Sequence, residues 1–143
     1  MIKNREIKIT ELHKVQKNKI GRINTNGMHK EHQENEAALH LALFGLDIEY
    51  IQQSNTKGTH NADFLIHGTI WELKSPNGSS LNAIERNFRA ANNQASNIIL
   101  DLRYFKIHYS KARVEALKQF KLFRRIRRMI LIEKSGKTLD IMK

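Results

Sequence analysis

ADFLIHGTIWELKSP, residues 62–76, predicts a β-hairpin. Two runs rich in branched and aromatic residues, 62–66 and 69–73, flank the pair His67-Gly68. A glycine-containing pair between two such runs is typical of a tight two-residue turn joining antiparallel strands. In this register residue 66 pairs with residue 69, and the pairs further from the turn follow in step. The stretch therefore predicts which side chains face one another across the hairpin.

Charged side chains are predicted to gather on one face of this hairpin. Asp63 lies directly opposite Glu72, and Lys74 joins Glu72 because side chains two apart on a strand share a face. Like charges placed directly opposite destabilise a sheet, so a positive charge should offset the two carboxylates. Lys74 supplies part of it, and a divalent metal such as Mg²⁺ or Mn²⁺ would supply the rest. The alternative is a surface hairpin whose Lys–Glu pair contributes roughly a few tenths of a kcal/mol.

The composition excludes several classes of protein. The 143 residues suit one domain with its own core, and the absence of cysteine excludes disulfides and thiolate zinc sites. No run approaches the roughly 18 apolar residues of a membrane helix. Residues 1–19 lack the apolar segment of a secretory signal peptide. We therefore expect neither a membrane span nor a signal sequence.

Positive charge is concentrated in the last third of the chain. The net charge is +11, with 12 Lys/Arg against 11 Asp/Glu in residues 1–102 and 13 against 3 in residues 103–143. Such a distribution favours binding of a polyanion such as nucleic acid, and a solvated basic tail is the alternative. The strongest cluster is FRRIRRM, residues 123–129, whose arginines can pair bidentately with phosphate. The candidate phosphate-binding residues are Lys118, Lys121, Arg124, Arg125, Arg127 and Arg128.

Helices and strands alternate along most of the chain. We expect residues 1–28 to form an N-terminal arm or linker that can include a short strand over residues 7–9, and residues 29–143 to form the functional domain with a basic C-terminal segment. The expected elements are a helix over 30–44, a strand over 46–51, the hairpin, a helix over 81–95, a strand over 97–102, a helix over 110–123 and a last hairpin over 127–142. Strand, helix, strand implies a parallel crossover, so the predicted class is α/β, with a mixed central sheet flanked by helices.

The helix over 30–44 carries a second metal-binding pattern. His29, His32, Glu36 and His40 are spaced three or four apart, which places them roughly along one stripe. Imidazole and carboxylate ligands at such spacing can bind Zn²⁺. We expect only Glu36 to point into the hairpin site, with His40 as its partner or as a core histidine. Zinc remains open as an alternative metal.

Aromatic and imidazole side chains follow the strand over 97–102. Tyr104 and Tyr109 are candidates for stacking on unpaired bases, and core packing is the alternative. His108 and Lys106 would serve a ribonuclease that needs no metal. Metal dependence would separate that activity from one based on the hairpin.

The hairpin residues resemble the core of PD-(D/E)XK nucleases. An Asp before a turn, then E-x-K on the next strand, matches Asp63 and Glu72-Leu73-Lys74. The superfamily often adds a carboxylate from the preceding helix, where Glu36 stands in ENEAAL, and some branches add a Gln on the following helix, where Gln94 stands. The resemblance covers about residues 30–103. It implies a restriction-endonuclease-like fold, with Glu36, Asp63 and Glu72 as metal ligands, Lys74 completing the catalytic set and Gln94 contacting nucleic acid.

A closer likeness is to the C-terminal toxin domains of CdiA-type contact-dependent growth inhibition proteins. They share a comparable string, ENE…ADF…G…WE…SP…Q, and several are metal-dependent tRNA nucleases. The resemblance implies a toxin-type endonuclease that cuts tRNA in the cytoplasm of a target cell, with an acidic cognate immunity protein as partner. A DNA endonuclease of the same superfamily and a non-catalytic nucleic-acid-binding module are the alternatives. This chain departs from some of these toxins by keeping Lys74 in the strand.

Overall fold

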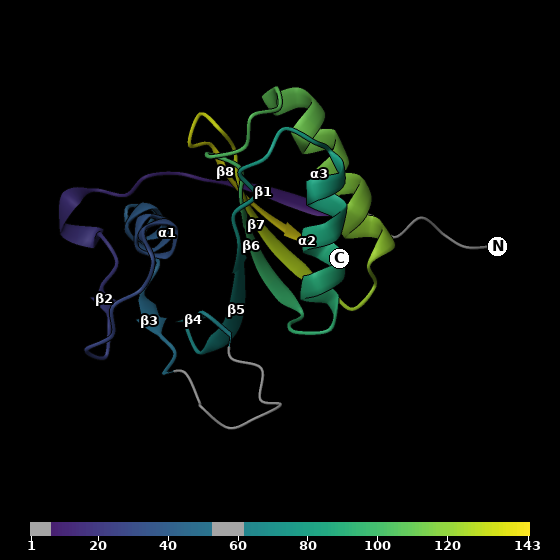
Figure 1. Cartoon of the computed structure of the whole chain (residues 1–143). Helices are drawn as coiled ribbons and strands as arrows, with labels where there is room; N and C mark the ends of the chain where they lie inside the picture. The colour runs from purple at the N-terminus through teal and green to yellow at the C-terminus, as the bar shows by residue number, and fades with distance from the viewer. Residues whose placement is uncertain (1–6, 53–61) are drawn as a thin grey trace. The chain divides into compact units, whose positions relative to one another are not determined.

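The computed structural model describes residues 7–52 and 62–143 and divides the chain into two compact units. Unit 1 comprises residues 1–12 and 74–143, and unit 2 comprises residues 13–73. The described residues contain three α-helices and eight strands (Figure 1), which confirms the predicted mixed α/β class. The boundary between the units falls near the end of one strand, between Leu73 and Lys74.

Unit 2 contains the predicted hairpin and the first helix. Its elements are the short 3-10 helix η1 (Lys17–Lys19), β2 (Ile23–Asn24), α1 (His32–Ala42), β3 (Ile48–Tyr50), β4 (Phe64–Ile66) and most of β5 (Thr69–Lys74). The strands lie in the order β5-β4-β3-β2, with β2 parallel to β3 and the other neighbours antiparallel. The sheet of unit 2 is therefore mixed.

The hairpin has the predicted register. Phe64 pairs with Trp71, and Ile66 pairs with Thr69. Both turn residues have positive φ, 49° at His67 and 80° at Gly68, as a type I′ turn requires. Glycine adopts this conformation freely, but a residue with a side chain, such as His67, does so less readily. The ring of His67 is held by a hydrogen bond, in which its Nε2 accepts from the backbone N–H of Asp47 at 3.4 Å. The alternation assigns Trp71 to the core, where its side chain is buried as expected.

Helix α1 is anchored by small and aliphatic residues. Ala37, Ala38 and Leu41 are fully buried, and the helix ends before Gly45, whose φ of 85° suits a glycine stop. Close packing continues at Gly21, where an added Cβ would lie 1.8 Å from the carbonyl oxygen of Leu46. Only glycine fits there, so the chain entering β2 can approach the end of α1 closely.

Unit 1 contains the remaining elements. These are β1 (Lys8–Leu12), α2 (Asn82–Asn92), β6 (Asn97–Asp101), α3 (Tyr109–Leu122), β7 (Arg128–Ile132) and β8 (Thr138–Met142). The strand order is β1-β8-β7-β6, with β6 parallel to β7 across the α3 crossover and the other neighbours antiparallel. Figure 1 shows α2 and α3 side by side on one face of this sheet. The predicted parallel crossover is therefore present.

The core of unit 1 joins both helices to the sheet. The predicted stripe of α2 is buried at Ile84, Phe88 and Ala91, which pack in one cluster with Phe120 of α3 and Ile98 of β6. Residues 98–101 are buried without alternation, as expected of a strand covered on both faces. Burying one large apolar side chain contributes roughly 1.5–3 kcal/mol, so this cluster dominates the stability of unit 1.

The segment predicted as an arm or linker, residues 1–28, contains two strands in its described part. Residues 8–12 form strand β1, whose five residues all pair with β8, and residues 23–24 form β2. Strand β1 lies at an edge of the sheet and four of its five residues are exposed, so its apolar pattern is too weak to reveal its full length. Its backbone pairing, which hydropathy does not reveal, holds it in place.

Candidate functional site

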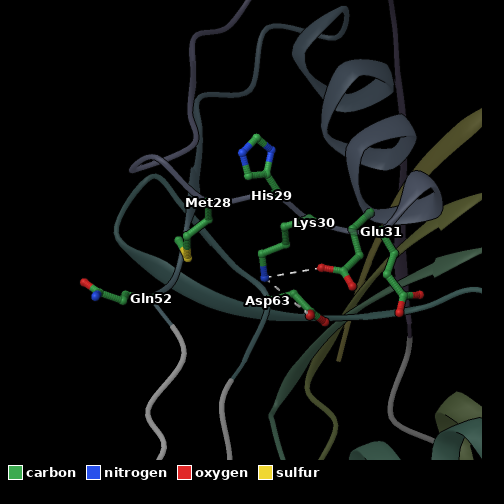
Figure 2. A pocket seen from close by; sticks show the side chains of 7 residues that line it. Met28, His29, Lys30, Glu31, Gln52 and Asp63 are labelled. Atoms are coloured by element: carbon green, nitrogen blue, oxygen red, sulfur yellow. Dashed lines mark ion pairs between the residues drawn. The ribbon is translucent and has the colours of Figure 1, made fainter.

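A pocket of about 440 Å³ opens in unit 2 beside the hairpin (Figure 2). It is lined by Met28, His29, Lys30, Glu31, Glu34, Gln52 and Asp63. The first five residues come from the segment that enters α1 and from its first turn, and Asp63 stands one residue before β4. The pocket is thus built by the helix start and the hairpin, the two elements that the resemblance singled out.

Asp63 is held against the neighbouring strand. Its backbone N–H donates to the carbonyl of Trp71 at 3.2 Å, and its Oδ2 accepts from the backbone N–H of Leu73 at 2.8 Å. Burial, and next the charge of Glu72, raise the pKa of the Asp63 carboxyl to about 6. The predicted like-charge neighbours, Asp63 and Glu72, are therefore close enough to repel each other. Glu72 is itself 7% exposed, so water screens this repulsion poorly.

Lys30 places a buried cation beside Asp63. Its Nζ lies 3.3 Å from Oε2 of Glu34 and 3.8 Å from Oδ1 of Asp63, the ion pairs drawn as dashed lines in Figure 2. Its side chain is only 6% exposed. Lys30 was not predicted as a site residue, because a single lysine before a helix carries no periodic signal.

Glu34, and not the predicted Glu36, is the helix carboxylate that interacts with Asp63. Burial and the charge of Asp63 raise the pKa of Glu34, while Lys30 opposes the shift. Two residues along an α-helix correspond to about 200° of rotation, so Glu36 points to nearly the opposite side of α1 from Glu34. Glu34 is thus a helix carboxylate beside Asp63 that the sequence did not single out, and the role of Glu36 as a ligand and catalytic residue stays a prediction.

The expected three-ligand groups do not form in the described part of the chain. Within residues 7–52 and 62–143, no three His, Asp or Glu side chains come together in a way that could hold a metal. This applies both to Glu36 with the two hairpin carboxylates and to the histidine stripe of α1. His40 is instead buried, with its ring 4.9 Å from that of Phe44. It is a core histidine, one of the two roles expected for it.

The hairpin carboxylates still fit one divalent metal. Mg²⁺ keeps several waters and is commonly bound through one or two carboxylates together with substrate phosphates. Asp63 and Glu72 provide two such groups, and the raised pKa of Asp63 shows that negative charge is disfavoured there without a further cation. The chemistry of this donor pair therefore suits Mg²⁺ or Mn²⁺ better than a closed zinc site.

Lys74 and Gln94 contact each other in unit 1. Lys74 ends β5, two residues after Glu72, and its Nζ donates to Oε1 of Gln94 at 3.2 Å. Gln94 lies just after α2. The residue predicted to contact nucleic acid is thus a hydrogen-bond partner of the predicted catalytic lysine.

The predicted phosphate-binding residues of unit 1 include one arginine that is paired with a carboxylate. Arg128 donates from Nε and Nη2 to the two carboxylate oxygens of Asp140, at 3.0 and 2.7 Å, so both arms of its fork are occupied. This contact gives Arg128 a structural partner within the protein, and its predicted part in a phosphate clamp stays a prediction. Of the six predicted phosphate-binding residues, the other five are exposed: Lys118, Lys121, Arg124, Arg125 and Arg127.

Lys143 fastens the segment that carries these arginines. Its Nζ donates to the carbonyl oxygens of Phe123 and Ile126, at 2.7 and 2.6 Å, and lies 4.4 Å from the ring centre of Phe120. Burial, and to a smaller degree Arg127, lower the pKa of Lys143 to about 8. The segment after α3 therefore has a fixed shape, which the sequence analysis did not foresee.

The aromatic and imidazole candidates have separate positions. His108 caps α3, with Nδ1 accepting from the backbone N–H of Ser110 at 3.3 Å. This structural contact gives the metal-independent ribonuclease no support. Tyr109 is 52% exposed and Tyr104 is partly buried, so a base could reach Tyr109 more easily.

Comparisons with known proteins agree with this architecture. The family model of the contact-dependent growth inhibition CdiA C-terminal domain matches residues 59–138, more than half of the chain. The fold is similar to that in the CdiA-CT/CdiI toxin and immunity complex from Burkholderia pseudomallei, with a TM-score of 0.67, 18% identity, and coverage of 86% of this chain and 100% of that chain. No curated protein matches the chain. Among the described residues, no helix is both long and apolar enough for a membrane span. The chain belongs to the CdiA C-terminal domain family of contact-dependent growth inhibition toxins.

Proposed function

We propose that this toxin domain is a metal-dependent endonuclease with a restriction-endonuclease-like PD-(D/E)XK core, and that its substrate is tRNA. The observation that carries the proposal is the pair formed by Asp63 and Glu72, where burial, and next the charge of Glu72, raise the pKa of Asp63 to about 6. Two neighbouring carboxylates that are poorly exposed to water and repel each other are stabilised by a divalent cation, and metal-assisted hydrolysis is a common use of such a pair.

Each residue near the hairpin has a defined part in this proposal. Asp63 and Glu72 would hold Mg²⁺ or Mn²⁺, and the metal would supply Lewis-acid polarisation of the phosphate and a more acidic water. The Leu73 N–H fixes the orientation of the Asp63 carboxylate. Lys74 orients or deprotonates the attacking water, or stabilises the charge that develops on the phosphate. Gln94 holds the ammonium of Lys74 by its hydrogen bond.

The exposed basic residues support a nucleic-acid substrate. Lys118, Lys121, Arg124, Arg125 and Arg127 provide five cations for the phosphate backbone, which binds any sequence. The preference for tRNA rests on the family likeness, because hydrolysis of this kind needs no 2′-hydroxyl and would also cut DNA.

The test compares substrates at equal salt and metal. Initial cleavage rates are measured on total tRNA, on duplex DNA of similar length and on single-stranded DNA, with Mg²⁺ or with EDTA, and with Asp63→Asn as the inactive control. Fastest cutting of tRNA supports the proposal, and faster cutting of either DNA points to a DNA endonuclease. Binding without cleavage of any substrate would identify a non-catalytic nucleic-acid-binding module.

A cognate immunity protein is the second proposed partner. The structurally similar protein is a toxin and immunity complex, and the exposed basic residues here favour an acidic inhibitor. The toxin would act in the cytoplasm of a target cell, where the inhibitor of a sister cell would neutralise it. Co-expression with an acidic protein encoded beside the toxin should restore growth, and it should block nucleic-acid binding in a salt-dependent way.

A further inference from the structure

Lys30 is a buried cation for which the proposed catalytic cycle has no use. Its side chain is 6% exposed, whereas lysine is almost never fully buried unless it is paired. Its ammonium lies between two carboxylates from different elements, Glu34 of α1 and Asp63 of the hairpin. One of these carboxylates, Asp63, is a proposed metal ligand.

The surroundings of Lys30 hold it in this position. Its Nζ lies 5.6 Å from the ring centres of both Tyr50 and Phe64, the distance of a cation–π contact. Its carbonyl oxygen accepts from Nδ2 of Asn35 at 2.9 Å, and Oδ1 of Asn35 accepts from the Tyr50 hydroxyl at 2.6 Å. The same few residues therefore hold both the backbone and the ammonium of Lys30 in place.

We propose that Lys30 competes with the divalent metal for Asp63, and so sets the affinity of the site for metal. The inference rests on the proposed function, because it assumes that Asp63 is a metal ligand. Two cations beside one carboxylate repel each other strongly where water is scarce. Metal binding must then move the ammonium away from Asp63. Glu34 is the nearer partner, at 3.3 Å against 3.8 Å, so Lys30 keeps a counter-ion when it gives up Asp63.

The first experiment measures binding of Mn²⁺ alone by isothermal titration calorimetry. Lys30→Met keeps the aliphatic stem and removes the charge, so it should bind Mn²⁺ about tenfold more tightly than the wild type. Lys17→Met removes an exposed lysine of the same unit and should leave the affinity unchanged. Unchanged or weaker binding by a folded Lys30→Met variant would overturn the proposal.

A double-mutant cycle tests the part assigned to Glu34. Glu34→Gln removes the alternative partner of Lys30, so Lys30 should hold Asp63 more firmly and Mn²⁺ should bind several-fold more weakly. In the Lys30→Met background the same substitution should have a smaller effect, because the competing cation is absent. An equal loss in both backgrounds would show that Glu34 acts directly on the metal, and would contradict the proposed exchange.

A measurement on the wild-type protein covers the case in which Lys30→Met fails to fold. The NMR signal of the Lys30 Cε–H group should shift during a Mg²⁺ titration and saturate together with the signal of Asp63. The shift should be absent in Asp63→Asn. A Lys30 signal that stays constant at saturating Mg²⁺ would overturn the inference.

The two proposals fail in different ways. Metal-dependent cleavage by the wild type, with the same Mn²⁺ affinity in Lys30→Met, would reject the role of Lys30 and leave the nuclease standing. Absence of both Mn²⁺ binding and cleavage in the wild type and in Lys30→Met would reject both. Binding of Mn²⁺ by Lys30→Met that is tighter than in the wild type, without cleavage by either protein, would support the competition and reject the nuclease.

Discussion

Oδ2 of Asp63 accepts a hydrogen bond from the backbone N–H of Leu73 at 2.8 Å. This bond crosses the hairpin and ties the carboxylate to β5, one residue beyond Glu72. It also lets an amide replace the carboxylate without loss of the contact, since the side-chain oxygen of Asn accepts in the same way. The charge at this position can therefore be removed while the local geometry is kept.

Asp63→Asn and Glu72→Gln should each lower the cleavage rate by at least about a hundredfold, because each removes one charged ligand of a two-carboxylate site. The measurement is the initial rate of tRNA cleavage at saturating Mg²⁺. Circular dichroism and thermal unfolding should show an intact fold for both variants. A folded variant with a near-normal rate would reject the assignment of that residue.

The stability of the protein in EDTA should depend on pH through Asp63. Its pKa is raised from 3.8 to about 6, so the folded protein holds this proton more tightly than the unfolded chain. Protonated Asp63 therefore contributes its full stabilisation of the folded state below about pH 4 and loses it as the pH rises to 6. The loss lowers the free energy of unfolding by roughly 3 kcal/mol. The free energy of unfolding is measured for the wild type and for Asp63→Asn at pH 4 and at pH 7. The difference between the two proteins is then compared between the two pH values.

That difference should shrink when saturating Mg²⁺ is added at pH 7, because a bound cation favours the ionised carboxylate. If the stability difference between the wild type and Asp63→Asn were the same at both pH values, the claim that folding raises the pKa of Asp63 would be rejected.

Gln94→Met should reduce cleavage less than Lys74→Met does. Gln94 acts through its 3.2 Å hydrogen bond to Lys74, so its loss misplaces the ammonium without removing it. In the Lys74→Met background, Gln94→Met should have little further effect, because its partner is gone. The measurement is kcat for the two single variants and the double variant, and independent, multiplying effects would show that Gln94 contacts the substrate directly.

Replacing Arg124, Arg125 and Arg127 with Gln should weaken nucleic-acid binding and flatten its dependence on salt. Each lost phosphate contact lowers the slope of log K against log salt by roughly 0.7–0.9. Arg128→Gln is the matched control. It should lower stability, because Asp140 loses its bidentate partner, and leave the slope nearly unchanged. If only Arg128→Gln changed the slope, Arg128 would be the phosphate contact, and the assignment of that role to Arg124, Arg125 and Arg127 would be rejected.

The sequence predicted the order and class of most elements because their patterns are local. The hairpin register followed from the Gly68 turn and residue alternation, and α2 followed from its apolar stripe. Strand β1 was foreseen only as a short strand over residues 7–9, because an exposed edge strand is held largely by backbone pairing, which hydropathy does not reveal.

The site was predicted less completely than the fold, because its details depend on tertiary contacts. The Asp63–Glu72 juxtaposition could be derived from register alone. Choosing Glu34 over Glu36 requires the rotation of α1 about its axis, which a polar first turn does not reveal. The place of Lys30 depends on two carboxylates and two aromatic rings from separate segments, so no local pattern marks it.

The central claim is that a divalent metal at Asp63 and Glu72 supports cleavage of the substrate. Its most direct test is the rate of tRNA cleavage by protein dialysed against EDTA, followed by titration with Mg²⁺ or Mn²⁺. We predict no cleavage in EDTA and a rate that rises with added metal for the wild type, but not for Asp63→Asn. Cleavage at full rate by the EDTA-treated protein would contradict the claim.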